Sequence, residues 1–300
     1  MPRSLSGASI CTEHTHPYPY RWTPRRPRPP YGDPDGTRRE KKMTEAATRR
    51  IPGAPCWVSL IVHGLTATQD FYSRLFGWEF RPGPEQLGPY VRALLDGKEV
   101  AGIGQLPPGR HLPIAWTTYL ATEDADVTAE AIRSCGGTVA VGPLDAGQAG
   151  RLLLASDPSG AVFGAWQAAE HLGTALAGTP GTPVWNELVT RETASVAKFY
   201  QAVFGFEAEP VVSADFDYQT LHLQGRPVAA LHGVGHGLPR DRGPHWMTYF
   251  QVADTDEAAA RVVELGGHVL QPPREASSGR LATVADPEGA VFTIVRPPGS

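Results

Sequence analysis

Glu187 is the polar side chain of this sequence that is best placed for chemistry. It lies two residues after Trp185 in a short segment that predicts a β-strand, so both side chains belong to one face of that strand. A carboxylate in an apolar pocket can act as a general base or hold a cationic ligand. We therefore predict Glu187 as the catalytic residue if the protein is an enzyme. The alternative is a carboxylate at the rim of a cleft, solvated or paired with an arginine.

Large aromatic residues gather on four short predicted strands, near residues 57–62, 116–120, 185–189 and 246–250. Because side chains alternate between the two faces of a strand, we expect every second residue of these segments to face a common cavity. An aromatic lining suits a flat or apolar ligand, and the alternative is ordinary core filling. The predicted ligand-binding residues are Trp57, Trp116, Thr118, Trp185, Trp246, Thr248 and Phe250.

Four histidines cluster in the second half of the chain, and they are the first place to look for an unusual metal site. They are His222, His232, His236 and His245. His232 and His236 are four residues apart, but two glycines between them indicate a loop rather than one face of a helix. Ligand spacing of this kind is weak evidence, and exposed loop histidines are the alternative.

The strands that carry these residues belong to a segment that occurs twice. A Trp followed after fourteen residues by Phe-Tyr-x-x-x-Phe-Gly occurs at Trp57 and again at Trp185, 128 residues further along. The motif Asp-Pro-x-Gly-Ala-Val-Phe at residues 157–163 returns at 286–292, at an offset of 129. Markers in one order at one spacing predict a duplicated fold, and the period is long enough for each copy to be a whole domain.

Within each copy the pattern predicts a strand, a helix and further strands, and then the same order again. In the second copy the first helix shows four apolar residues on one face: Val196, Phe199, Tyr200 and Val203. Thr193 or Ser195 can cap its start, and Gly205 suits the left-handed residue that ends it. Each copy is therefore predicted as two βαβββ units.

The domain boundaries follow from these markers and from composition. We predict domains at 55–167 and 183–296, joined by an Ala-, Gly- and Thr-rich linker at 168–182. Residues 1–42 hold eight prolines and nine Arg or Lys against four acidic residues, so this segment is predicted as a basic, proline-rich disordered tail. Met43 looks like a natural start for the folded part, so the tail is either disordered or an upstream extension that is not made in the cell.

This arrangement resembles the vicinal oxygen chelate superfamily, which includes glyoxalase I, extradiol dioxygenases and the bleomycin-resistance binding proteins. The resemblance rests on the strand-opening tryptophans, the Phe-Tyr-x-x-x-Phe-Gly helices, the Gly-Gly helix ends and the Asp-Pro-x-Gly-Ala-Val-Phe hairpins, and it covers residues 55–296. It implies an α+β fold of two tandem glyoxalase-like domains. Each domain would be a pair of βαβββ units that curl into a half-open barrel around one cavity.

The resemblance also places the superfamily's metal ligands, which are His, Gln or Glu on cavity-facing strands. The matching positions in this chain are Trp57, Thr118 and Gly164 in the first copy, and Trp185, Thr248 and Thr293 in the second. Neither indole, hydroxyl nor glycine side chains bind a divalent metal well. We therefore expect no metal and no other cofactor, which argues against glyoxalase or dioxygenase chemistry of the usual kind.

Charge, length and cysteine content exclude several classes of partner. The net charge is −4, and the tail accounts for +5, so residues 43–300 carry −9. An acidic body does not favour nucleic acid or an anionic membrane, and no apolar run approaches the length of a membrane span. Three scattered cysteines, Cys11, Cys56 and Cys135, favour a reducing cytoplasm. We expect a monomer or homodimer.

Together these features favour a cytoplasmic protein that binds a small aromatic or amphipathic molecule without metal, in the manner that the resemblance to bleomycin-resistance proteins implies. The alternative within the same fold is an enzyme, either a glyoxalase-like lyase or isomerase or a hydroxylase-type protein that uses Glu187. A third reading is a structural or regulatory protein with an empty site. We expect the second copy to carry the site, because Ser59 stands in the first copy where Glu187 stands in the second.

Overall fold

The computed structural model describes residues 51–109, 112–212, 217–240 and 242–299. The prediction of a disordered tail at 1–42 lies outside these residues. The first copy contains β1 (Pro55–Val62), α2 (Leu65–Phe76), β2 (Glu79–Pro82), β3 (Tyr90–Leu95), β4 (Lys98–Gln105), β5 (Trp116–Thr122), α3 (Ala125–Ser134), β6 (Thr138–Asp145), β7 (Gly150–Ser156) and β8 (Val162–Ala168). The second contains β9 (Pro183–Thr190), α4 (Thr193–Phe204), β10 (Glu207–Pro210), β11 (Asp217–Leu223), β12 (Arg226–Gly233), β13 (His245–Gln251), α5 (Thr255–Glu264), β14 (His268–Ala276), β15 (Gly279–Ala285) and β16 (Val291–Arg296).

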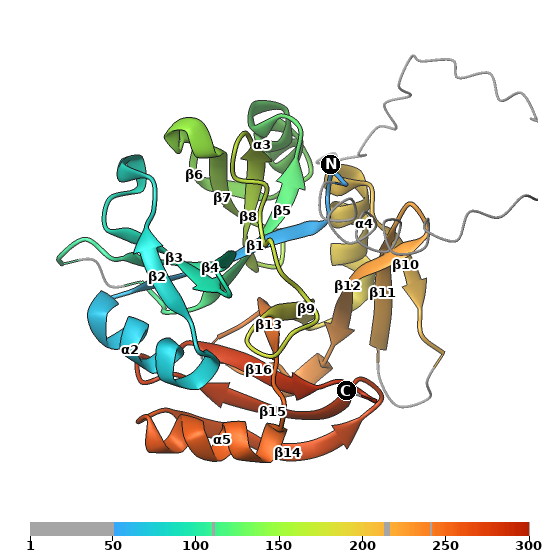
Figure 1. The fold of residues 1–300 in the computed structure, drawn as a ribbon. Coiled ribbons are helices and arrows are strands. Elements are labelled where there is room, and N and C mark those ends of the chain that lie inside the picture. Colours follow the sequence, from blue (N-terminus) through green and yellow to red (C-terminus); the bar gives the residue numbers. More distant parts are fainter. Residues whose placement is uncertain (1–50, 110–111, 213–216, 241, 300) are drawn as a thin grey trace, which may run out of the picture.

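Each copy forms one curved sheet of eight strands (Figure 1), in the orders β2-β3-β4-β1-β5-β8-β7-β6 and β10-β11-β12-β9-β13-β16-β15-β14. The first strands of the two units, β1 and β5 or β9 and β13, pair antiparallel at the centre of the sheet. The sheets are not closed barrels, and this confirms the predicted fold of two tandem, half-open glyoxalase-like domains.

The four strands at the sheet edges, β2, β6, β10 and β14, escaped the sequence analysis. Most of their residues are exposed or half-buried, so they lack the apolar alternation that marks a strand with one buried face. Each of them directly follows a helix and brings the number of strands after that helix to three, which completes the βαβββ unit. Polar, exposed edges also discourage pairing with another chain.

The helices behave largely as the sequence predicted. Val196, Phe199 and Tyr200 are buried on one face of α4, which ends at Gly205 in the left-handed conformation with φ of 73°. The predicted cap is wrong: Glu192 occupies the N-cap position without a side-chain bond, and the Thr193 amide instead donates to Asp217 at 2.8 Å. Within the described ranges, no helix is long and apolar enough to cross a membrane.

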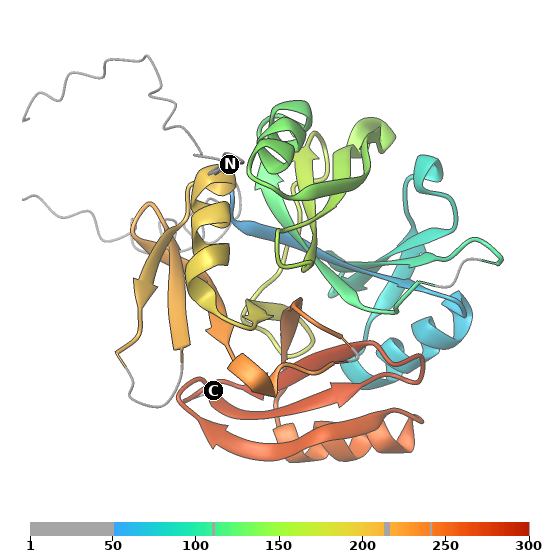
Figure 2. The same ribbon diagram turned by 180° about the vertical axis from the view of Figure 1, so that it is seen from behind.

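The hydrophobic cores join the two copies rather than filling each one separately. One core combines α2 and its strands with β13–β16 and α5 of the second copy, and the other combines α3, β7 and β8 with α4 and β9–β12. Figure 1 shows α2 lying beside the red strands of the second copy, and Figure 2 shows α3 beside α4 from behind. The two sheets therefore present their outer, concave faces away from a shared interior.

Two buried hydrogen-bond chains cross this shared interior. The indole of Trp116 donates to the Tyr72 hydroxyl at 3.0 Å, which in turn donates to Asp286 of the second copy at 3.1 Å. The second chain runs from the second copy to the first: Trp246 donates to the Tyr200 hydroxyl, which donates to Asp157 of the first copy. The aspartates are those of the Asp-Pro-x-Gly turns, so this motif tightens a hairpin and also links the copies.

Asp286 should make stability depend on pH. Burial raises the pKa of its carboxyl to about 6, from an ordinary value of 3.8. Its contribution to stability is therefore fully present below pH 3.8 and is lost as the pH rises through 6. Relative to Asp286→Asn, the wild-type free energy of unfolding should fall by roughly 3 kcal/mol between pH 3.5 and pH 7. Denaturant unfolding of both proteins measures this difference, and a difference that stays constant with pH would contradict the assignment.

Candidate functional site in the second concave face

The concave face of each sheet is identified by the register of its central strands. In the first copy Trp57 pairs with Tyr119, and the Ser59 hydroxyl lies 3.3 Å from the Tyr119 hydroxyl. In the second copy Trp185 pairs with Tyr249, and Glu187 pairs with Met247 two residues further along β9. The prediction that Trp185 and Glu187 share a face therefore agrees with the register.

The prediction for the fifth strand of each copy is wrong by one residue. Thr118 pairs with Val58 and Thr248 with Asn186, so both lie on the opposite face of the sheet from Trp57 and Trp185. Both hydroxyls donate to the Asn186 side chain, at 2.8 and 3.2 Å, between the two copies. Three more residues that were predicted to face the cavity lie instead on the opposite face, in the shared cores. They are Trp116, Trp246 and Phe250.

Aromatic rings fill the concave face of the first copy. A side chain at Gly102 would collide with the ring and hydroxyl of Tyr90, and one at Gly164 would lie 2.2 Å from the Tyr119 ring. These two glycines thus let the tyrosines lie flat on the sheet. The remaining cavity, between Trp57, Tyr90 and Tyr119, has a volume of about 30 Å³, which holds no more than one or two water molecules.

The linker between the copies closes what remains of this face. The His171 ring stands edge-on to Trp57 with centroids 4.4 Å apart, and its Nδ1 lies 2.7 Å from Glu99. Trp166 donates its indole N–H to the His171 carbonyl at 2.8 Å. The hydrogen bond from His171, helped by Arg92, lowers the pKa of Glu99 to about 2. The first copy therefore holds an internal occupant where a ligand would sit.

The second concave face is built around the Glu187 carboxylate. Glu187 is only 6% exposed. The Tyr218 hydroxyl donates to its Oε2 at 3.0 Å, and the His232 Nδ1 lies 3.0 Å from its Oε1. Trp185 and Tyr249 beside it are half-buried, whereas their counterparts Trp57 and Tyr119 are buried. Here a buried negative charge lies next to accessible aromatic surface.

Burial and the nearby carboxylate together keep the surrounding phenols neutral. Burial, followed by the negative charge of Glu187, raises the pKa of both Tyr218 and Tyr249. Both hydroxyls therefore stay protonated at neutral pH and remain able to donate hydrogen bonds. The combination can hold a ligand that offers hydrogen-bond donors or positive charge, and it can also move protons.

The four histidines of this copy do not converge. His232 reaches Glu187, but His222 faces Glu209 at 3.6 Å and His245 approaches the Gly243 carbonyl at 2.7 Å. His236 lies exposed in the 3-10 turn Gly235–Gly237. Across the described parts of the chain, no three His, Cys, Asp or Glu side chains come together in a way that could hold a metal.

Comparison with known proteins assigns the chain to a family. The glyoxalase-like domain model matches residues 186–295. The protein named "Putative glyoxylase CFP32" of Mycobacterium tuberculosis is 36% identical over 252 residues, which cover 82% of this chain and 95% of that protein. The chain belongs to the vicinal oxygen chelate superfamily. The anthracycline biosynthesis protein DnrV of Streptomyces peucetius is 35% identical over 266 residues, covering 83% of this chain and 94% of that protein.

Solved structures of the superfamily share the fold at low sequence identity. The Mn(II)-bound glyoxalase of Novosphingobium aromaticivorans aligns with a TM-score of 0.57 and 18% identity, over 81% of each chain. The 2,3-dioxygenase LapB of Pseudomonas sp. KL28 also aligns with a TM-score of 0.57, at 16% identity, over 81% of this chain and 92% of LapB.

The metal of other superfamily members does not fit this chain. On the concave faces the three matched positions are Trp57, Tyr119 and Gly164 in the first copy; in the second they are Trp185, Tyr249 and Thr293. These side chains offer no set of carboxylates, imidazoles or amides, and Tyr119 covers Gly164. Correcting the register by one residue thus leaves the donor set as poor as before.

The tyrosines of the site were missed from the sequence. Tyr218 and Tyr249 complete the Glu187 site, and Tyr90 and Tyr119 stand at the same places in the first copy. The signal that could have found them is their recurrence within the chain. Tyr90 returns as Tyr218 at an offset of 128, and Tyr119 returns as Tyr249 at an offset of 130.

Proposed function

We propose that this protein binds a small, flat aromatic molecule on the second concave face, without metal. The observation that carries the proposal is the Glu187 carboxylate, buried on that face and held by Tyr218 and His232 at 3.0 Å each. A buried charge beside half-buried aromatic rings costs stability unless a ligand or neighbouring groups compensate it. The first copy has Ser59 at this position and a face already filled by its own residues.

The chemistry of the face suggests the class of ligand. Trp185, Tyr218 and Tyr249 offer rings on which a planar molecule can stack. Glu187 favours a ligand that carries hydroxyl or amine donors over one that carries a carboxylate. Relatives at 35% identity are named for anthracycline biosynthesis, and anthracyclines are flat, polycyclic and hydroxylated. We therefore infer a hydroxylated polycyclic aromatic as the ligand class.

We place the protein in the cytoplasm. The sequence holds three scattered cysteines, Cys11, Cys56 and Cys135, without the spacing of a metal site. An odd number of scattered cysteines is typical of a reducing compartment, and this supports the placement.

Glu187→Gln should weaken binding of 1,8-dihydroxyanthraquinone by about tenfold or more, because it replaces a charged acceptor by a neutral amide and turns one of the two oxygens that face Tyr218 and His232 into a donor. Isothermal titration calorimetry measures the change. Ser59→Ala, at the matched position of the first copy, is the control and should leave the affinity unchanged. If both variants bind like wild type while Trp57→Ala abolishes binding, the first copy carries the site instead.

A second candidate function is proton transfer, as in a glyoxalase-like lyase or isomerase. The observation that favours it is the contact of a carboxylate, an imidazole and a phenol at Glu187, His232 and Tyr218. Such a set can take a proton from a carbon next to a carbonyl and return it to the neighbouring carbon. The hemithioacetal of methylglyoxal and a thiol is a suitable test substrate. Its isomerisation to a thioester moves one proton from the hemithioacetal carbon to the neighbouring carbonyl carbon and one proton from the hemithioacetal hydroxyl to the carbonyl oxygen, with no external oxidant or reductant. If His232→Gln abolishes turnover, the result would favour catalysis by these three groups. If turnover survives the change, they are not the catalytic groups.

A further inference from the structure

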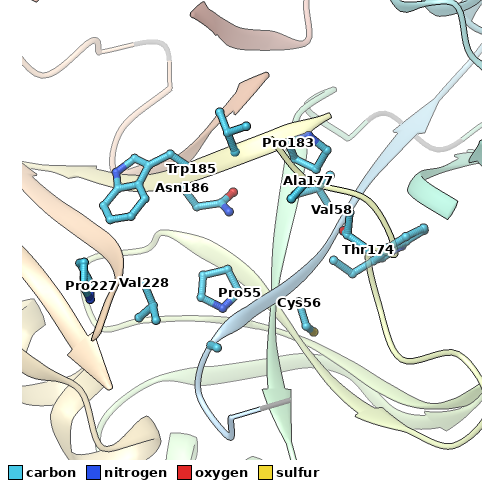
Figure 3. Close-up of a pocket in the computed structure, with 13 residues that line it drawn as sticks. Pro55, Cys56, Val58, Thr174, Ala177, Pro183, Trp185, Asn186, Pro227 and Val228 are labelled. Atoms are coloured by element: carbon cyan, nitrogen blue, oxygen red, sulfur yellow. The ribbon is translucent and has the colours of Figure 1, made fainter. Parts of the chain in front are cut away.

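One row of residues crosses the second concave face from its centre to its outer edge. Each residue pairs with the next one on the neighbouring strand, so their side chains share this face. The row begins at Trp185 of β9, whose ring also lines the cleft of about 260 Å³ drawn in Figure 3. It continues through Tyr249, Thr293 and Thr283 to Gln271 on the edge strand β14.

The edge strand adds a positive charge to this face. Arg274 of β14 pairs with Leu281, which lies two residues before Thr283 on β15, so Arg274 and Thr283 share the concave face. The Thr283 hydroxyl donates to the Gln271 side-chain oxygen at 3.4 Å, and this leaves the NH₂ group of Gln271 as a donor. The outer end of the row therefore offers hydrogen-bond donors and a guanidinium.

The matching positions of the first copy are apolar. The row that begins at Trp57 and Tyr119 continues there through Gly164 and Leu154 to Val141. Leu144, which pairs with Leu152, stands where Arg274 stands in the second copy. Since the first copy builds the same sheet with apolar residues, the fold does not require polar ones here. Their presence on the open face alone points to a ligand with a polar group.

Arg274 is exposed and is not engaged by an acidic side chain. The next arginine along the chain, Arg280, shows the contrast, because it pairs with Asp256 at 2.5 Å and with Glu275 at 3.2 Å. Among residues 51–109, 112–212, 217–240 and 242–299, no carboxylate lies within ion-pair distance of Arg274. Its guanidinium is therefore available to a ligand.

The charges of Glu187 and Arg274 both act on the Tyr249 hydroxyl. Burial and then the negative charge of Glu187 raise the pKa of Tyr249, whereas the positive charge of Arg274 lowers it. In the order of the strands, β13 with Tyr249 lies between β9 with Glu187 and β14 with Arg274. A flat molecule that stacks on the Tyr249 ring therefore has a negative group toward one end and a positive group toward the other.

We propose that Arg274 and Gln271 form an anion subsite, which binds a carboxylate at the end of the ligand remote from Glu187. This inference rests on the proposed function, because the ligand's rings must lie on the second concave face. A guanidinium binds a carboxylate through charge-assisted hydrogen bonds, often two in parallel. The subsite narrows the ligand class to hydroxylated aromatic acids, held with the hydroxyls toward Glu187 and the carboxylate toward Arg274.

The 3-carboxylate of 1,8-dihydroxyanthraquinone tests the subsite, and the 3-hydroxymethyl derivative is its uncharged counterpart. In calorimetric titrations of the full-length protein, the carboxylate should bind about tenfold more tightly than the hydroxymethyl compound, because it gains hydrogen bonds between charged groups. Arg274→Gln should remove this advantage, so that the variant binds both compounds equally. Arg261→Gln is the matched control, since it removes the same charge on α5 and should preserve the tenfold advantage.

Equal affinity of the wild type for the two compounds, or an advantage that persists in Arg274→Gln, would overturn the anion subsite. Glu187→Gln separates this outcome from failure of the proposed function, because it should weaken binding of the hydroxymethyl compound by about tenfold. If it does so while the wild type shows no preference for the carboxylate, only the subsite is wrong. If Glu187→Gln has no effect, or if neither compound binds, the proposed function fails and the subsite fails with it.

Discussion

Trp78→Ala should destabilise both copies together, by about 3–5 kcal/mol. Trp78 is 1% exposed and donates its indole N–H to the Gly181 carbonyl of the linker at 2.7 Å. It stacks on Tyr72 and meets Phe250 of the second copy at a centroid distance of 5.8 Å. Truncation would open a cavity in a core that α2 shares with β13–β16. Denaturant unfolding should show a single transition, shifted to lower concentration.

Hydrogen exchange distinguishes this result from local damage. If the shared core makes the copies one cooperative unit, amides of β13 and β16 should lose protection as much as those of β1. Val127→Ala, on the exposed side of α3, is the control and should change stability by less than about 0.5 kcal/mol. Two separate transitions, with the second copy unaffected, would show that the copies fold independently.

Gly164→Val should destabilise the protein by about 3 kcal/mol, near the upper end of the cost of overpacking. A Cβ at this position would lie 2.2 Å from the Tyr119 ring. Tyr119 is 7% exposed and packs with Trp57, Leu152 and Trp166, so its ring cannot move aside without displacing its neighbours. Thermal or denaturant unfolding measures the loss.

Thr293→Val is the matched control in the second copy, because residue 293 occupies the same place on β16 as Gly164 on β8. This position already holds a β-branched side chain, so the change adds no bulk and removes one buried hydroxyl. It should therefore cost about 1 kcal/mol, the usual net contribution of one hydrogen bond, and less than Gly164→Val. Equal losses in the two variants would mean that the first copy's face has more room than its packing indicates.

The sequence predicted the fold where signals are local and repeated. The recurrence of Trp57 at Trp185 and of the Asp-Pro-x-Gly motif identified two copies, and helix periodicity placed α4. The edge strands gave no signal, because strands that bury neither face have no apolar alternation. The packing of α2 against the second copy could not be predicted either, since it depends on contacts more than 150 residues apart, such as that between Tyr72 and Asp286 at a separation of 214.

The candidate site was predicted in part. Glu187 was placed on the concave face from the alternation along a single strand, which is a local property. Thr118 was misplaced because its face depends on how β5 pairs with β1, and β5 carries aromatic residues on both faces: Trp116 on one and Tyr119 on the other. When both faces are buried, residue type alone cannot tell cavity from core. The role of His171 was equally hidden, because linker composition says nothing about where a loop lies.

The linker with His171 has a consequence for how the two copies diverged. A chain built from two copies has two concave faces but only one linker between the copies. The linker can cover only one face, so the two copies differ in their surroundings even where their sequences are alike. The linker leaves the end of the first copy and lies across that copy's face. The order of the halves along the chain, together with their sequences, thus decides which face stays accessible. A circular permutant that began at β9 and carried the linker after β16 would be expected to exchange the covered and the open face.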